Sequence, residues 1–290
     1  MSVTLEFGGM SPVSPTTARW ELVLRLRELR EQRGFDSAGF ARRVGFTPAN
    51  WSHVEKGRRV LTGSTIGPVL DVLDIAEDER VELLSLLEAS KQRAWWTSAA
   101  IGSELQRLYG MEAGAASVRS YDSLIVPGLL QTESYARALI SADVMISPVQ
   151  VDQLVAIRLR RQERLRDADP LEVTAVVGEA TLRQQTGGAT VLREQLLHLV
   201  SLLRELDTVN IRVIPFDAPS GAVLGGSSFH LLDFASDQLP TFAWAESAVF
   251  GGAVDDAEQV RDLGFAYLRA LDQSLSRPDS LALISRYAKG

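Results

Sequence analysis

Residues 37–57 read SAGFARRVGFTPANWSHVEKG, and their pattern predicts two short helices joined by a tight turn. Helices that cross at close range need a small side chain at the contact and a left-handed residue where the first helix ends. Ala41 and Gly45 meet these two needs. Thr47 followed by Pro48 is a typical helix start, with a capping hydroxyl and a proline in the first turn. The stretch therefore predicts a helix-turn-helix.

The second helix of this motif, residues 47–56, has two faces of different character. Its apolar residues Trp51 and Val54 fall on the side predicted to be buried, together with Phe40 and Val44 of the first helix. The opposite side carries small or polar groups that suit the major groove of DNA: Thr47, Ala49, Asn50, Ser52 and His53. Arginines flank the helix and are predicted to meet phosphates: Arg42, Arg43, Arg58 and Arg59. The alternative is an ordinary helical hairpin whose charges are solvated.

The distribution of charge favours the first of these interpretations. The net charge of −7, taken alone, argues against nucleic-acid binding. Residues 18–60, however, hold ten Lys or Arg against five Asp or Glu, a local charge of +5, and residues from 61 onward sum to −11. A basic module joined to an acidic body is typical of a DNA-contacting domain attached to one that does not touch DNA.

Composition excludes several classes of protein. The length of 290 residues favours two domains. The absence of cysteine excludes disulfides and thiolate metal sites, and three scattered histidines do not suggest a zinc site, so we expect neither metal nor cofactor. No run of about 18 apolar residues is present, and residues 1–17 lack the pattern of a signal peptide. We therefore expect a cytoplasmic protein.

Apolar spacing and cap signals predict how the chain is organised. Residues 1–17 read as a flexible arm, residues 18–94 as a five-helix DNA-binding domain, and residues 95–290 as an α+β domain for sensing or partner binding. The helices of the first domain are expected at 19–33, 36–44, 47–56, 63–74 and 77–94. The second domain is expected to hold helices at 98–118, 131–142, 148–167, 191–206 and 255–276, and a small, partly antiparallel sheet built from 171–180, 210–216, 227–234 and 240–247.

Residues 20–75 resemble the lambda-repressor-like, XRE-type helix-turn-helix domain, whose third helix reads the major groove. The resemblance implies that Ser37 contacts a phosphate at the start of the second helix, where the family usually has glutamine. Arg30 and Glu55 resemble a family ion pair that ties the first helix to the third, which is a structural role. The residues placed at base edges or the adjacent backbone are Thr47, Pro48, Ala49, Asn50 and His53.

Two of these positions depart from the long polar side chains that are common early in such a recognition helix. Pro48 and Ala49 offer apolar contact to a thymine methyl group, whereas Asn50 or His53 can form a hydrogen bond with a base. Direct readout is therefore expected to depend on few hydrogen bonds.

The chain after about residue 93 resembles the C-terminal domain of the WhiJ-like regulators of actinomycetes. The resemblance implies a one-component regulator linked to development or secondary metabolism, often encoded beside a small partner protein in an antitoxin-like arrangement. It is carried by Trp95-Trp96, VPGLLQTESYARALI (126–140), Arg158 to Gln162, GEATLRQQTGG (178–188), REQLLHL (193–199), IRVIPF (211–216), FHLLDF (229–234) and AWAES (243–247).

The residues of this domain allow both structural and functional interpretations. The turn at Pro127-Gly128 is expected to lead into core residues Leu129, Leu130, Tyr135 and Leu139. A basic helical face is expected to be solvated, with contact to an acidic partner or DNA as the alternative: Arg158, Arg160, Arg161, Arg164 and Arg166. Glycines lacking the context of a phosphate loop are read as a flexible connection: Gly221, Gly225 and Gly226.

Glu179 and Glu246 are candidates for an acid–base pair or a ligand site, together with Arg158 and Arg161. The alternative is that each carboxylate caps a helix or pairs with a nearby arginine. No serine, histidine and aspartate arrangement and no lysine nucleophile is evident, so we expect no enzyme.

Three functions follow, in decreasing order of support. The first is a sequence-specific DNA-binding regulator, expected to be a homodimeric repressor on an operator with two half-sites about ten base pairs apart. The second is an interaction protein whose C-terminal domain binds a small partner protein, with the apolar stripes of residues 191–206 and 255–276 as the surface for that partner or for the dimer. The third is a small-molecule sensor that uses the region of Glu179 and Glu246.

Overall fold

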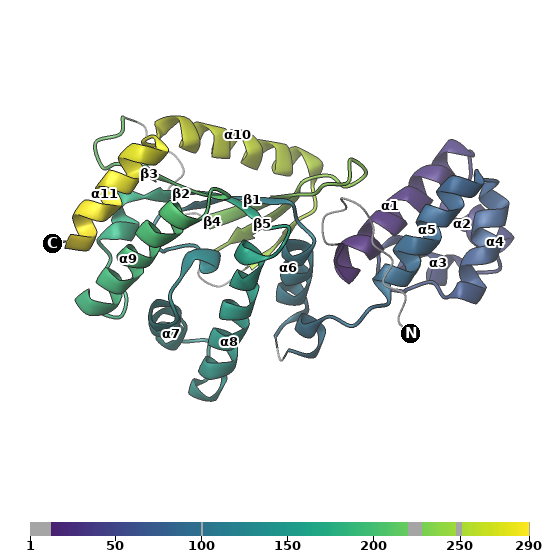
Figure 1. Cartoon of the computed structure of the whole chain (residues 1–290). Coiled ribbons are helices and arrows are strands. Elements are labelled where there is room, and N and C mark those ends of the chain that lie inside the picture. Colours follow the sequence, from purple (N-terminus) through teal and green to yellow (C-terminus); the bar gives the residue numbers. More distant parts are fainter. Residues whose placement is uncertain (1–12, 100, 220–227, 248–250, 290) are drawn as a thin grey trace. The chain divides into compact units, whose positions relative to one another are not determined.

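The computed structural model describes residues 13–99, 101–219, 228–247 and 251–289. The chain divides into two units, residues 1–100 with 234–240, and residues 101–233 with 241–290 (Figure 1). The predicted fold class is confirmed, because a module of five α-helices precedes an α+β region with a mixed sheet. The predicted connection at Gly221, Gly225 and Gly226 lies outside the described residues.

The N-terminal unit is built from α1 (Pro15–Gln32), α2 (Ser37–Arg43), α3 (Pro48–Glu55), α4 (Gly63–Leu73) and α5 (Glu77–Ser90). All five helices contribute apolar residues to one core, with Trp51 of α3 fully buried at its centre. The Trp51 ring lies 5.0 Å from that of Phe40 and 5.7 Å from that of Phe46, measured between centroids. The core therefore fixes α3 against α2 and the turn between them.

The first helix begins earlier than expected. Residues 1–12 of the predicted flexible arm lie outside the described residues, but α1 already begins at Pro15. Ser14 caps it, since its hydroxyl accepts a hydrogen bond from the backbone N–H of Thr17 at 3.1 Å. A capping serine followed by proline is the same start signal that opens α3, so the expectation of a loose arm up to residue 17 was wrong for its last residues.

The C-terminal unit contains a six-stranded sheet in the order β3-β2-β1-β4-β5-β6. The first three strands, β1 (Ser117–Asp122), β2 (Glu172–Gly178) and β3 (Val209–Ile214), run parallel to one another. The other three, β4 (Ser228–Asp233), β5 (Phe242–Glu246) and β6 (Gly251–Val254), join them with antiparallel pairing throughout. Strands β1, β2, β3 and β5 consequently end at the same edge of the sheet.

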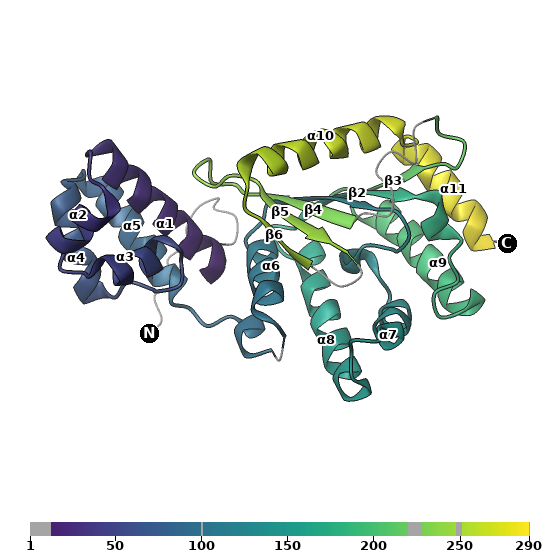
Figure 2. The same cartoon turned by 180° about the vertical axis from the view of Figure 1, so that it is seen from behind.

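Helices cover both faces of this sheet (Figures 1 and 2). On one face lies α10 (Ala257–Gln273), which buries Tyr267 and Ala270 against Tyr121, Val176 and Phe229. The other face is covered by α6 (Ser103–Ala113), α7 (Glu133–Ala142), α8 (Val151–Gln162) and α9 (Ala189–Glu205). The last helix, α11 (Arg277–Lys289), packs against α9 and β3. None of the helices in the described ranges is long and apolar enough to cross a membrane.

Three elements differ from the sequence-based expectation. The helix expected over residues 98–118 ends at Ala113, and the chain continues into β1, which lies in the middle of the sheet. Strand β6 was not expected at all. The helix expected over residues 255–276 is α10, which ends at Gln273, but α11 (Arg277–Lys289), which follows it, was not expected.

Candidate nucleic-acid interface

The turn between α2 and α3 has the geometry that its sequence predicts. Gly45 has a φ of 81°, the left-handed conformation that glycine adopts without strain. Behind it, the backbone N–H of Phe46 donates to the carbonyl oxygen of Ala41 at 2.8 Å, which closes the end of α2. Ala41 is fully buried. These contacts confirm the predicted structural roles of Ala41 and Gly45.

Helix α3 presents outward the face that its sequence predicts. Thr47 caps the helix, since its hydroxyl accepts a hydrogen bond from the backbone N–H of Asn50 at 3.2 Å. The inward side chains Trp51 and Val54 are buried. The residues predicted to approach bases are exposed or half-buried: Thr47, Pro48, Ala49 and His53 are exposed, and Asn50 is half-buried. The predicted recognition face is therefore open on the surface of this unit.

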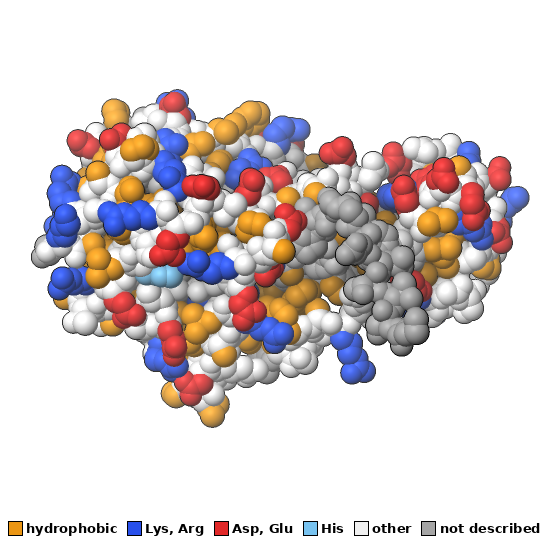
Figure 3. Space-filling view, viewed as in Figure 1, with side chains coloured by type: hydrophobic (Ala, Val, Ile, Leu, Met, Phe, Trp, Pro, Cys, Tyr) orange, Lys and Arg blue, Asp and Glu red, His pale blue; other side chains and the backbone are white. Residues whose placement is uncertain are grey.

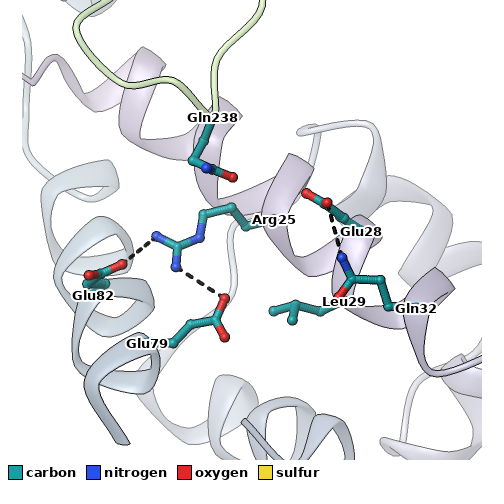
Figure 4. A pocket seen from close by; sticks show the side chains of 7 residues that line it. All are labelled: Arg25, Glu28, Leu29, Gln32, Glu79, Glu82 and Gln238. Atoms are coloured by element: carbon teal, nitrogen blue, oxygen red, sulfur yellow. Dashed lines mark hydrogen bonds and ion pairs between the residues drawn. The ribbon is translucent and has the colours of Figure 1, made fainter. Parts of the chain in front are cut away.

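The ten basic residues of the segment 18–60 fall into two groups of five. One group is engaged inside the N-terminal unit. Arg27 donates to the carbonyl oxygen of Glu55 at 2.5 Å, and Arg33 donates to that of Leu73 at 2.7 Å. Arg25 pairs with Glu79 at 3.2 Å and with Glu82 at 2.9 Å, as Figure 4 shows. The remaining members, Arg19 and Arg30, also form hydrogen bonds within the unit.

The second group stays exposed around α3. These residues form no ion pair with an acidic side chain of the described chain: Arg42, Arg43, Lys56, Arg58 and Arg59. Two of them lie over aromatic rings, Arg43 at 5.5 Å from the Phe35 centroid and Arg59 at 5.6 Å from the Phe46 centroid. The excess of positive charge is thus concentrated at the ends of α2 and α3. Lys56 was not singled out in the sequence, although it follows α3 directly.

Glu55 is the hub that fixes α3 to α1 and α2. Arg30 of α1 donates to one carboxylate oxygen at 2.7 Å, and Ser37 of α2 donates to the other at 2.7 Å. Burial alone would raise the pKa of Glu55, but the hydrogen bonds from Ser37 and Arg30 outweigh it and lower the pKa. The predicted ion pair between Arg30 and Glu55 is confirmed.

The hydrogen bond from Ser37 to Glu55 affects the phosphate contact that was predicted for Ser37. A serine hydroxyl has one proton to donate, and here Glu55 receives it. A phosphate oxygen only accepts hydrogen bonds, so a contact through the Ser37 hydroxyl requires the bond to Glu55 to break. The exposed arginines need no such exchange.

The basic face predicted on α8 is largely turned inward, so the expectation of a solvated or partner-binding surface was wrong for three of its five arginines. Arg161 forms two hydrogen bonds with Glu112 of α6, at 2.8 and 2.7 Å. Arg158 donates to the buried Gln131 at 2.8 Å, and Arg164 donates to the carbonyl oxygen of Ala115 at 3.1 Å. Only Arg160 and Arg166 are exposed. These inward contacts join α8 to α6 and to the segment before α7.

The pKa values of the two innermost arginines of α8 are shifted in opposite directions. Burial lowers the pKa of Arg158, which has no carboxylate in direct contact. It would also lower the pKa of Arg161, but the adjacent Glu112 carboxylate raises that pKa overall. The Arg161–Glu112 pair is therefore a charged link within the core of this unit.

The structure does not bring Glu179 and Glu246 together. Both oxygens of Glu179 are engaged, one by the backbone N–H of Phe216 at 2.7 Å and one by the hydroxyl of Tyr287 at 2.5 Å. Glu246 accepts from the indole N–H of Trp244 at 2.8 Å. Glu179 directly follows β2, and Glu246 is the last residue of β5. Because strands β1 and β4 lie between β2 and β5, the usual strand spacing separates the two residues by about 14 Å. In the described residues neither carboxylate caps a helix or forms an ion pair with an arginine, as the alternative had it; each accepts hydrogen bonds from other neighbouring groups.

A carboxylate that the sequence did not single out lies in this unit. Asp122 ends β1 and is buried, with Ser228 of β4 donating to one of its oxygens. Its other oxygen has no hydrogen-bond partner among the residues that the structure describes. Burial raises the pKa of Asp122, and the nearby His230 and Ser228 offset this only in part. Recognising it from sequence would have required recognising β1.

Three of the four residues predicted to form a core after Pro127-Gly128 are buried. Leu129, Leu130 and Tyr135 are buried, while Leu139 is half-buried. The hydroxyl of Tyr135 accepts a hydrogen bond from the backbone N–H of Val126 at 3.3 Å. This segment is therefore structural.

Comparison with known proteins divides the chain at the same place. Residues 21–83 match a family described as a helix-turn-helix domain, and residues 105–286 match one described as a domain of unknown function, DUF5753. No curated protein and no solved structure matches the chain. The first match covers α1 to α4 and the beginning of α5, so the chain carries the helix-turn-helix domain of a DNA-binding transcription regulator. Because the second match spans more than half of the sequence, the chain belongs to the family defined by the DUF5753 domain.

Proposed function

We propose that the protein is a sequence-specific transcriptional regulator that acts in the cytoplasm as a dimer, represses from an operator, and belongs to the XRE-type regulators of WhiJ-like organisation. The observation that carries the proposal is the exposed outer face of α3, with five cations at its margins that form no ion pair among the described residues. Cations placed in this way neutralise phosphates and fix the register of a helix on the duplex. The proposal includes no catalytic step.

Within this proposal, only a few side chains of α3 recognise the base sequence of the DNA. Asn50 presents an amide that suits adenine, and His53 presents a ring nitrogen to a base edge one turn further along α3. Pro48 and Ala49 contribute apolar contact to thymine methyl groups. One such module buries little surface, so two copies on adjacent half-sites supply the affinity.

Enrichment of DNA by the purified full-length protein tests the proposal. Fragmented genomic DNA is incubated with the protein at about 150 mM salt, and the bound fragments are sequenced. We expect a motif of two related half-sites about ten base pairs apart, centred upstream of genes. A bound pool with no shared motif, indistinguishable from the input, would overturn the proposal.

The double substitution Arg58→Ala/Arg59→Ala tests the phosphate contacts. Each phosphate contact that is lost lowers the slope of log K against log salt by about 0.9, so a fall of about 1.8 per protomer is expected, with the preferred sequence unchanged. Fluorescence anisotropy titrations from 50 to 300 mM salt measure this slope. The matched control Arg193→Ala/Arg204→Ala removes two exposed arginines of α9 and should leave the slope unchanged. Equal slopes for both variants would contradict the assignment.

A second, additional role is favoured by the loop between α7 and α8. The side chains of Val144, Met145 and Val149 are largely exposed there. Large apolar side chains that gather on a surface commonly mark an interaction site. We propose that the C-terminal unit binds a small partner protein encoded nearby, in an antitoxin-like arrangement that modulates DNA binding. Co-purification of the neighbouring gene product tests this role, and the absence of any complex at micromolar concentration would exclude it.

A further inference from the structure

The outward face of α10 carries apolar side chains that are exposed among the described residues. The inner face of this helix buries Tyr267 and Ala270. On the opposite side Phe265 and Leu268 are 64% and 55% exposed. Figure 3 shows hydrophobic side chains reaching the surface along this helix. A helix of 17 residues with one face on the core does not need a second apolar face, so this face has another use.

The residues of this face follow the spacing of a helix–helix contact. Arg261, Phe265, Leu268 and Asp272 are separated by four, three and four residues, which places them on one stripe. The apolar pair lies in the middle of the stripe, and opposite charges lie at its ends. Both charged side chains are exposed, and within the protomer they make only marginal contacts, Arg261 with Glu258 and Asp272 with Arg269, both at 4.0 Å.

Gly264 lies beside this stripe, in the middle of α10. A Cβ atom placed there would meet nothing within 4 Å, so crowding does not exclude a side chain. A glycine inside a helix costs about 0.5–1 kcal/mol relative to alanine. A glycine is useful at such a position where the backbone of another helix approaches closely.

We propose that α10 is the dimer interface, where it pairs antiparallel with α10 of a second copy of this chain. A two-fold axis passing between Phe265 and Leu268 places each Phe265 against Leu268 of the partner subunit. The same axis places Arg261 against Asp272 of the partner subunit, and the reciprocal pair forms at the other end. A parallel pairing would instead oppose like charges, so the stripe is complementary to itself in one orientation only.

Other exposed apolar residues fit a second copy less well. Leu197 of α9 is a single exposed side chain, since α7 and α11 cover much of the rest of that helix. Beside the apolar residues of the α7–α8 loop, Arg137 and Asp152 already pair with each other within the protomer. Of the two stripes that the sequence offered for a dimer, the one on α10 is therefore the better candidate.

This inference deepens the proposed function, because dimerisation supplies the second half-site contact, but it is tested without DNA. The mass of the full-length protein is measured by sedimentation equilibrium between 0.5 and 50 μM. We expect a dimer whose dissociation constant rises at least tenfold in R261D and in D272R. The combined variant R261D/D272R restores opposite charges across the axis and should return within about threefold of the wild-type value.

Two further variants separate packing from folding. The Cβ atom of Gly264→Phe would meet nothing within 4 Å in the described part of the protomer, so this variant should leave the circular dichroism spectrum unchanged and yet give a monomer. The matched control Leu197→Ser removes an exposed leucine from α9 and should leave the dimer intact. A wild-type monomer at 50 μM, or a combined charge variant no tighter than the single ones, would overturn the inference. A wild-type dimer that enriches no DNA motif would leave this interface standing and refute the proposed function.

Discussion

The substitution Arg161→Met is expected to destabilise the C-terminal unit by about 3–5 kcal/mol, the usual cost of removing one partner of a buried ion pair. The side chains of Arg161 and Glu112 are only 10% and 7% exposed, and two hydrogen bonds of 2.8 and 2.7 Å join them. Methionine fills much of the volume of the arginine but leaves the Glu112 carboxylate buried without a cation. Domains are stable by only about 5–15 kcal/mol, so this loss removes a large share of the stability of the unit and should lower its unfolding temperature.

The companion substitution Arg161→Met/Glu112→Leu distinguishes a lost pair from lost packing. Replacing both partners by apolar residues is often neutral or stabilising, so the double variant should recover most of the loss. Urea unfolding followed by hydrogen exchange in β1, β2 and β3 measures the stability of this unit. The matched control Arg166→Met breaks an exposed pair with Glu205 and should cost less than about 1 kcal/mol. A loss below 1 kcal/mol for Arg161→Met as well would show that the buried pair contributes little.

The α8 arginines show where sequence reasoning stops. Helical spacing shows that Arg158 and Arg161 share a face, but it cannot show what lies against that face. The acid that pairs with Arg161 is 49 residues away, on α6, and the amide that receives Arg158 belongs to Gln131. Long-range partners of this kind convert an apparently solvated face into an internal one. The helix-turn-helix was predictable because its decisive contacts are local.

Strand β1 was missed for a related physical reason. A strand in the middle of a sheet usually reads as a continuous apolar run, but SVRSYD contains Ser120 and Asp122, both buried. Its pairing with β2 and β4 determines its conformation, and neither neighbour is close in sequence. Local propensity therefore gave no sign of β1, although Gly114, the residue that caps the end of α6, is a helix stop signal.

Helix α11, in contrast, carried a recognisable start signal. Ser276 precedes Pro278, and its hydroxyl accepts a hydrogen bond from the backbone N–H of Asp279 at 3.2 Å. A hydroxyl side chain that caps the third following residue, with proline in the first turn, is the pattern that opens α1 (Ser14) and α3 (Thr47) as well. Applying the rule evenly along the chain would have predicted this further helix after residue 276.

The substitution Trp51→Ala is expected to destabilise the N-terminal unit by about 3–5 kcal/mol. Trp51 is fully buried, its ring meets those of Phe40 and Phe46, and it lies on the helix that carries the proposed recognition face. A small domain collapses only partly around a cavity of this size, so the loss should approach the whole stability of a five-helix unit. Specific DNA binding should then disappear together with the protection of α1 to α5 from hydrogen exchange.

The matched control Trp51→Phe keeps an aromatic ring in the same place and should cost less, with DNA binding retained. Hydrogen exchange read separately in the two units shows where the damage lies, because β1 to β3 should keep their protection in both variants. Trp51→Ala and Arg58→Ala/Arg59→Ala should both weaken DNA binding, but only the first should lower the unfolding temperature of the N-terminal unit. Loss of binding by Trp51→Ala with the unit still folded would contradict the assignment, because Trp51 faces the core and cannot itself touch a duplex. The contrast between these two variants therefore separates the surface that binds DNA from the core that positions it.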